Sequence, residues 1–203
     1  MPKKGAQTGN QFERDVARKL GKAIYDDPDA IWRTHGSGGW KRAKDAKSGI
    51  HPGDLYPVKQ VPFPFKFIVE CKDRRGWSLD DFFNLKKKNK ILEWWGKLQD
   101  DQKLAGDQYK NHCPILVITK AYYAELVVFS SEIFDWELEL SSNRPFEKFY
   151  TGNTRVFTFS HFHFMDFDDF CNYLDKHYEL WRNSSKRYLM VEEKSVTDET
   201  THS

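Results

Sequence analysis

Cysteine is scarce in this chain, and its spacing forms no framework. The 203 residues contain three cysteines, at positions 71, 113 and 171, and no C-x-x-C pair. An odd and widely spaced set argues against both a disulfide scaffold and a zinc ribbon. We therefore expect Cys71 and Cys113, which lie in or beside apolar runs, to be buried reduced thiols.

Long hydrophobic runs are also missing. No apolar stretch approaches the roughly 18 residues of a membrane-spanning helix, and the N-terminal MPKKGAQTGN lacks the apolar centre of a secretory signal. We expect a soluble, cytoplasmic protein with no membrane partner. The chain has no internal repeat, heptad pattern, P-loop or G-x-S-x-G motif, so nothing in it indicates a P-loop nucleotidase or a serine hydrolase.

What the sequence does contain is enough apolar and aromatic side chain for a real core. Hydrophobic residues make up 39% of the chain, and it holds 16 Phe, 9 Tyr and 7 Trp. At this length one α/β domain is expected. Residues 184–203 are polar and lack periodicity, which predicts a disordered tail.

The net charge of +2 hides an asymmetry between the two parts of the chain. Residues 1–120 hold 24 Lys and Arg against 15 Asp and Glu, whereas residues 121–203 hold 8 against 15. A basic half is expected where the substrate is a polyphosphate, although it is also compatible with an ordinary solvated surface.

One apolar run ends in a charged triplet. Residues 65–69, FKFIV, are aromatic and β-branched and are followed by Glu70-Cys71-Lys72, which predicts a strand. Alternation along that strand places Glu70 and Lys72 on one face and Cys71 on the other.

A third charged residue precedes this strand. Asp54 follows the Pro52-Gly53 pair, and we expect it to reach the face of Glu70 and Lys72 from a preceding strand. Two carboxylates can hold a hard divalent cation such as Mg²⁺, and a neighbouring ammonium can orient water or stabilise charge on a phosphate. The alternative is that Glu70 and Lys72 only form an ion pair where the strand leaves the core.

Several basic or polar segments are candidate contacts for DNA. Residues 35–50 are rich in glycine and serine and interleave Lys41, Arg42 and Lys44 with Trp40, a composition suited to docking on a phosphate backbone. The alternative is a plain flexible loop. Arg74 and Arg75 form a charged turn directly after the Glu70 strand.

The rest of the pattern gives a coarse order of elements. It predicts a helix from Thr8 or Asn10 to Tyr25, strands over 30–33, 114–120, 125–129 and 154–164, a long helix from Ser78 or Asp80 to Leu104, a short helix near 131–136, and a last helix from Asp166 or Asp168 to Trp181. Gln99 and Gln102 share one face of the long helix, where they either point at DNA or at the site, or form satisfied amides or a solvated edge.

The order of these motifs resembles the PD-(D/E)XK nuclease superfamily, and within it the archaeal and phage Holliday-junction resolvases. The resemblance covers roughly residues 8–120 and is carried by these residues in order: Glu13, Arg33, Gly36-Ser37-Gly38, Gly53-Asp54, Glu70-Cys71-Lys72 and the Pro114–Lys120 strand. It implies a restriction-endonuclease-like α/β fold, with a central mixed β-sheet flanked by helices. Residues 1–183 would form one nuclease domain, with a core over 8–120 and a C-terminal addition over 121–183.

The resemblance also implies roles for individual residues. Asp54 and Glu70 would bind Mg²⁺, or alternatively Mn²⁺, with Glu13 and the backbone carbonyl of Cys71 completing the set. Lys72 would position the attacking water or help to deprotonate it. The predicted DNA contacts are Arg33, Ser37, Gly38, Lys41, Arg42, Lys44, Arg74, Arg75, Gln99 and Gln102.

The substrate implied is a four-way DNA junction, cut by a homodimer in a bacterial or archaeal cell, with a cellular or a viral gene as the source. The chain is longer than the compact archaeal members require, which favours the phage type with an added C-terminal part. Symmetric cutting of two strands requires a two-fold interface, and hydrolysis would leave a 5′-phosphate. The competing interpretations are a restriction-type or repair endonuclease of the same superfamily, a catalytically silent DNA-binding module, and a generic α/β domain in which E-x-K is accidental.

Overall fold

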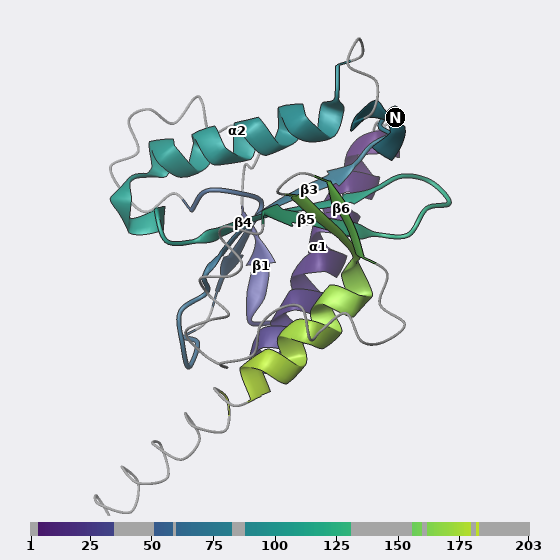
Figure 1. Ribbon diagram of the computed structural model, residues 1–203. Helices are drawn as coiled ribbons and strands as arrows, with labels where there is room; N and C mark the ends of the chain where they lie inside the picture. The colour runs from purple at the N-terminus through teal and green to yellow at the C-terminus, as the bar shows by residue number, and fades with distance from the viewer. Residues whose placement is uncertain are drawn as a thin grey trace, which may run out of the picture.

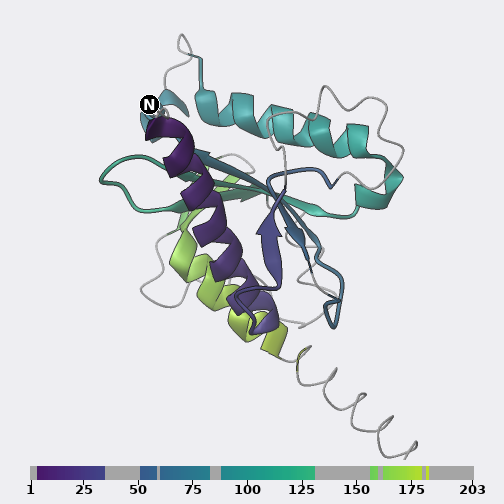
Figure 2. The ribbon, with the colours of Figure 1, turned by 180° about the vertical axis from the view of Figure 1, so that it is seen from behind.

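The computed structural model describes residues 4–34, 51–58, 60–82, 88–130, 156–159, 162–179 and 182 (Figures 1 and 2). The helices are α1 (Lys4–Tyr25), η2 (Leu79–Phe82), α2 (Lys90–Ala105), η3 (Asp107–Tyr109) and an unlabelled C-terminal helix over 167–179. The strands are β1 (Ile31–Arg33), β2 (Leu55–Pro57), β3 (Phe67–Asp73), β4 (Cys113–Thr119), β5 (Leu126–Ser130), β6 (Val156–Phe159) and β7 (Phe162–Asp166).

A five-stranded mixed sheet forms the centre of the molecule, in the order β3-β4-β5-β7-β6. β3 and β4 are parallel, and the other neighbours are antiparallel. β1 and β2 form a separate antiparallel pair. The predicted α/β class with a mixed sheet flanked by helices is confirmed, and the part of the chain after residue 120 supplies three of the five strands.

Helices cover both faces of the sheet and divide the core in two (Figure 1). On one face, α1 and the C-terminal helix pack on alternate residues of β3, namely Phe67, Val69 and Cys71. On the other face, Ile91, Trp95 and Leu98 of α2 pack against Ile68 and its neighbours. β4 is buried on both faces, as its unbroken apolar sequence predicts.

The first helix starts earlier than predicted. Phe12, Val16, Leu20 and Ile24 form its buried face with helical spacing, as expected. Thr8 and Asn10 were predicted as N-caps, and this is wrong because α1 begins at Lys4. The N-terminal segment KGAQ contains no residue that forces a stop, and the Asn10 side chain instead accepts a hydrogen bond of 2.9 Å from Arg33 Nη2.

The predicted long helix exists and ends at Ala105, close to the predicted Leu104, but its predicted start at Ser78 or Asp80 is wrong. η2 is a short 3₁₀ turn, and α2 begins only at Lys90. Asn89 is the N-cap, and its side-chain oxygen accepts from the backbone N–H groups of Ile91 and Leu92 at 2.9 and 3.2 Å. The C-cap of the helix is Gly106, whose φ of 97° few other residues adopt.

The single strand predicted over 154–164 is two strands. β6 and β7 pair antiparallel, with Val156 opposite Met165, so the chain reverses within a segment whose alternation continues on both sides of the turn. The helix predicted at Asp166 is confirmed, since the Asp166 carboxylate accepts from the N–H groups of Asp168 and Asp169. The short helix near 131–136 and the tail over 184–203 lie outside the described residues.

The predicted state of the thiols is confirmed. Cys71 and Cys113 are buried, reduced thiols. Burial, followed by the negative charge of Asp54, raises the pKa of the Cys71 thiol well above its usual value, so this group stays protonated and belongs to the core. Among the described helices, none combines the length and the apolar character needed to cross a membrane.

Candidate active site

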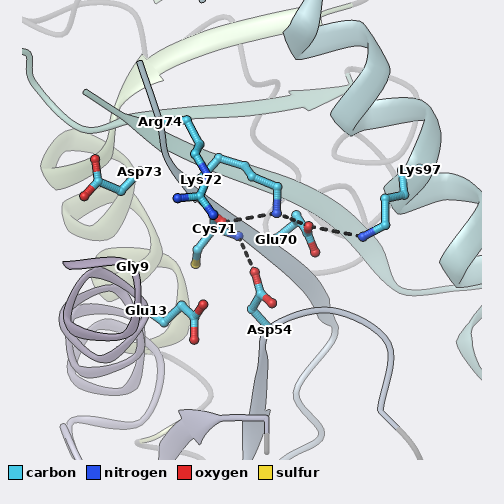
Figure 3. A pocket seen from close by; sticks show the side chains of 9 residues that line it. All are labelled: Gly9, Glu13, Asp54, Glu70, Cys71, Lys72, Asp73, Arg74 and Lys97. Atoms are coloured by element: carbon cyan, nitrogen blue, oxygen red, sulfur yellow. Dashed lines mark hydrogen bonds and ion pairs between the residues drawn. The ribbon is translucent and has the colours of Figure 1, made fainter. Parts of the chain in front are cut away.

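A polar pocket of about 190 Å³ lies at the carboxyl end of β3, where four segments of the chain meet (Figure 3). α1, the segment before β2, β3 itself and α2 all contribute to it. Its lining is formed by Gly9, Glu13, Asp54, Glu70, Cys71, Lys72, Asp73, Arg74 and Lys97. All four residues predicted to be catalytic therefore share one pocket, together with Lys97 of α2, a residue that was not predicted to belong to it.

Asp54 is fixed on the outer edge of β3. Its backbone N–H donates to the Val69 carbonyl at 2.7 Å, and its Oδ2 accepts from the Cys71 N–H at 2.8 Å. β3 is an edge strand of the sheet, so these bonds satisfy groups that no neighbouring strand reaches. Asp54 was predicted to reach the face of Glu70 and Lys72, and its carboxylate lines the same pocket as they do, approaching along the edge of the strand.

Gly53 allows this close approach. Its φ is +86°, and a Cβ at this position would lie 2.6 Å from the Val69 carbonyl oxygen. A larger residue would collide with the strand that carries the E-x-K triplet. In the Gly-Asp pair, the glycine therefore allows the backbone to approach β3, and the aspartate supplies the carboxylate of the pocket.

Glu70 and Lys72 lie on the same side of β3, as predicted. They share this side with Ile68, whose side chain packs under α2, and Lys72 Nζ forms an ion pair with Glu70 Oε1. Lys72 Nζ also lies 3.4 Å from the Cys71 carbonyl oxygen. One ammonium thus contacts two of the oxygen atoms expected to bind a metal.

Lys97 extends from α2 toward the same carboxylate. Its Nζ lies 3.6 Å from Glu70 Oε1 and 3.5 Å from Asp101 Oδ2. Burial lowers the pKa of Lys97, but attraction to Glu70 and Asp101 outweighs this and raises the pKa above its ordinary value. The Lys97 side chain keeps half of its surface exposed, so it can serve both Glu70 and a ligand in the pocket.

Glu13 projects from α1 and lies on the other side of Asp54 from Glu70 and Lys97 (Figure 3). Its Oε2 accepts a hydrogen bond of 2.8 Å from Arg33 Nε, and both side chains are mostly buried. Arg33, predicted to contact DNA, is therefore paired with a carboxylate of the site. The ion pair joins α1 to the end of β1 and holds Glu13 in place.

Asp54 is held in an environment that disfavours its charge. Burial is the largest cause, repulsion from Glu70 is the next, and the pKa of Asp54 is raised to about 7. Lys72 and the Cys71 N–H act in the opposite direction. A carboxylate destabilised in this way gains more from a nearby cation than an exposed one does.

The donor chemistry of the pocket fits a hard divalent cation. Carboxylate and carbonyl oxygens are the ligands such ions prefer, and two of them, from Glu70 and Cys71, already hold the Lys72 ammonium. Among the described residues, no three His, Cys, Asp or Glu converge in a metal-binding geometry. Glu13 and Glu70 are instead engaged by Arg33, Lys72 and Lys97.

Comparison with known families matches residues 4–179 to the family described as "Phage putative PDDEXK endonuclease". The chain belongs to this family of phage endonucleases. The match covers α1 to the C-terminal helix, and it confirms the predicted superfamily and its restriction-endonuclease-like fold. No curated protein and no solved structure matches the chain.

As a member of this family, the protein is a nuclease. Besides Arg33, its predicted DNA contacts lie in different surroundings. Arg74 lines the pocket and Arg75 is exposed beside it. The Gln102 amide donates to the backbone carbonyls of Tyr109 and His112 at 2.8 and 2.9 Å, which favours the satisfied-amide alternative. Gln99 is partly buried on α2 away from the pocket lining. The predicted contacts Ser37, Gly38, Lys41, Arg42 and Lys44 lie outside the described residues.

Sequence reasoning missed Lys97. The signal was present, because Lys97 precedes Leu98 in a helix whose buried face packs on the E-x-K strand. Using it requires knowing that α2 crosses this particular strand near Glu70.

Proposed function

We propose that this nuclease is a divalent-metal-dependent DNA endonuclease that cuts four-way junctions in the manner of a Holliday-junction resolvase. The observation that carries the proposal is the meeting of Asp54, Glu70 and Lys72 in one pocket at the end of β3. The basic N-terminal part of the chain and the exposed Arg74 and Arg75 beside the pocket support a polyanionic substrate.

Asp54, Glu70 and the Cys71 carbonyl would hold Mg²⁺, or alternatively Mn²⁺, with Glu13 as a further carboxylate. When bound, such an ion neutralises phosphate charge and makes bound water more acidic. Lys72 would then contact the attacking water, since its ammonium lies among these oxygens. Hydrolysis that expels the 3′ oxygen leaves a 5′-phosphate.

Arg74 and Lys97 would bind the phosphate on either side of the scissile bond. Both line the pocket, and neither is held in a fully buried ion pair. A junction has two equivalent strands to cut, so the proposal includes a homodimer with one pocket per subunit.

The test is cleavage of a labelled immobile four-way junction with Mg²⁺, beside a linear duplex of matched sequence. We expect paired symmetric nicks in the junction, a 5′-phosphate product, and a dimeric mass for the protein–junction complex by light scattering. Loss of cutting on addition of EDTA, with recovery in excess Mg²⁺ or Mn²⁺, would identify the metal requirement.

Asp54→Asn is the matched inactive control. Asparagine keeps an oxygen that can accept from the Cys71 N–H and removes the buried charge, so we expect no cleavage and unfolding at the same or a higher denaturant concentration. Cutting of linear duplex at fixed sequences would favour a restriction-type enzyme. Binding without any cutting would favour a silent DNA-binding module, and either result would overturn the resolvase proposal.

A further inference from the structure

The turn between β4 and β5 presents two tyrosines to solvent. The Tyr122 side chain has a relative exposure of 104% and Tyr123 of 62%. Tyr122 also has a φ of +68°, a conformation that few aromatic residues adopt. This backbone strain and the exposure of an aromatic residue both lower stability. Among the described residues, no contact of Tyr122 compensates for them.

A rigid base supports this turn. Lys120 Nζ lies 4.0 Å from the ring centroid of Tyr123 and 4.5 Å from that of Trp77, and it donates to the Trp77 carbonyl at 3.0 Å. Trp77 is 4% exposed and belongs to the core beneath α2. The turn is therefore anchored by one cation between two rings, and Tyr122 projects from a fixed position.

The turn adjoins the active-site pocket. The Arg74 N–H donates to the Thr119 carbonyl at 3.1 Å, so the residue that lines the pocket is bonded to the strand that leads into the turn. Figures 1 and 2 show the β4–β5 connection projecting on the side of the molecule where α1 begins. Arg74 and the next residue, Arg75, are both exposed, and Arg74 links the pocket to the strand that leads into the turn.

We propose that Tyr122 stacks on a nucleobase at a DNA branch point or gap, while Arg74 and Arg75 bind the adjoining phosphates. Aromatic rings next to cations match single-stranded or unstacked nucleic acid, in which a base face is available beside an anionic backbone. In continuous duplex every internal base face is covered by its neighbours. Tyr122 would therefore favour interrupted DNA, which deepens the proposed function and rests on it.

The test is equilibrium binding of full-length protein carrying Asp54→Asn, which prevents cleavage. The probes are a four-way junction, a duplex with a short single-stranded gap and a continuous duplex of the same sequence, followed by fluorescence anisotropy. Tyr122→Ala is compared with Tyr122→Phe, which retains the ring, and with Leu104→Ala, which removes an apolar side chain that is 69% exposed on α2.

We expect Tyr122→Ala to weaken binding of the junction and the gapped duplex by about tenfold, the scale of base–aromatic stacking. Binding of continuous duplex should change by less than about twofold. Tyr122→Phe and Leu104→Ala should behave like the parent protein on all three probes.

Equal losses on all three probes, or no loss on any, would overturn the stacking role. So would a change from dimer to monomer in Tyr122→Ala, because the tyrosine would then belong to a protein interface. The parent protein separates the two proposals: failure to prefer the junction over continuous duplex contradicts the resolvase function. A selective loss on the gapped probe would still support Tyr122 as a stacking residue.

Discussion

Lys97 lines the pocket although it lies outside the Asp54 and Glu70-Cys71-Lys72 motif. Glu70 Oε1 has two ammonium groups near it, one from Lys72 on the same strand and one from Lys97 on α2. The Lys72 contact is local, two residues along a strand, and follows from the sequence. The Lys97 contact depends on how α2 packs, so the sequence pattern does not contain it.

We predict that Lys97→Gln lowers kcat/KM for DNA cleavage by about tenfold or more, because a cation directed at the reacting phosphate is lost. Stability should change little, since a half-exposed ion pair contributes about 0–1 kcal/mol. The measurements are initial cleavage rates and urea unfolding. Lys103→Gln, on an exposed position of the same helix, is the control, and equal effects of the two substitutions would contradict a role for Lys97 in the site.

The residues that could be predicted are those fixed by short stretches of chain. Asp54, Glu70 and Lys72 are identified by a turn, a strand and alternation, and Glu13 by the resemblance. Arg33 was expected on DNA, whereas the structure pairs it with Glu13. Opposite charges on separate elements find each other through tertiary packing, which local patterns do not describe.

At the scale of elements, the segment before β2 positions Asp54 against β3. Asp54 bonds to the E-x-K strand through both its backbone N–H and its carboxylate. Gly53 lies directly against Val69 in the same contact. The position of the aspartate is therefore set by one glycine.

We predict that Gly53→Ala destabilises the protein by about 1–3 kcal/mol, because its φ is positive and the added Cβ meets a carbonyl oxygen. It should also abolish cleavage by displacing Asp54. Gly96→Ala is the matched control, since nothing lies within 4 Å of a Cβ there, and in a helix interior it should stabilise by about 0.5–1 kcal/mol. Similar unfolding midpoints for the two variants would contradict a close contact between Gly53 and the Val69 carbonyl of β3.

Elements were predicted well where one apolar run forms one element. β3, β4 and β5 follow directly from such runs. The start of α2 was wrong because Ser78, Asp80 and Asn89 are all good caps, and packing decides which of them is used. The β6–β7 hairpin was missed because alternation alone does not show where a chain reverses.

At the scale of the whole molecule, burial sets the response to acid. Burial lowers the pKa values of His51 and His177. Burial, with repulsion from Lys66 and His51, lowers the pKa of His112 to about 4. These folded-state values lie below the ordinary value near 6.5, so the unfolded chain binds protons that the folded protein does not.

We predict that the contribution of these histidines to the free energy of unfolding is present above about pH 6.5 and is lost as the pH is lowered toward 4. Asp54, whose pKa is raised to about 7, contributes in the opposite direction, because the folded protein binds its proton at a higher pH than the unfolded chain does. His112→Gln, which cannot be protonated, should therefore lose less stability than the parent protein between about pH 6.5 and 4. Urea unfolding at closely spaced pH values measures both. An unchanged slope in His112→Gln would mean that the other histidines account for the effect.

Sealing of the β3 edge by Asp54 has a consequence for aggregation. An open edge strand is a template for pairing with other chains. Here Asp54, the proposed catalytic aspartate, bonds to the Val69 carbonyl and the Cys71 N–H that would otherwise offer that template. Removing its carboxylate by truncation would uncover part of the edge. An inactivated form made with alanine at position 54 should therefore self-associate more readily than one made with asparagine, and relatives that have lost nuclease activity should favour asparagine at this position.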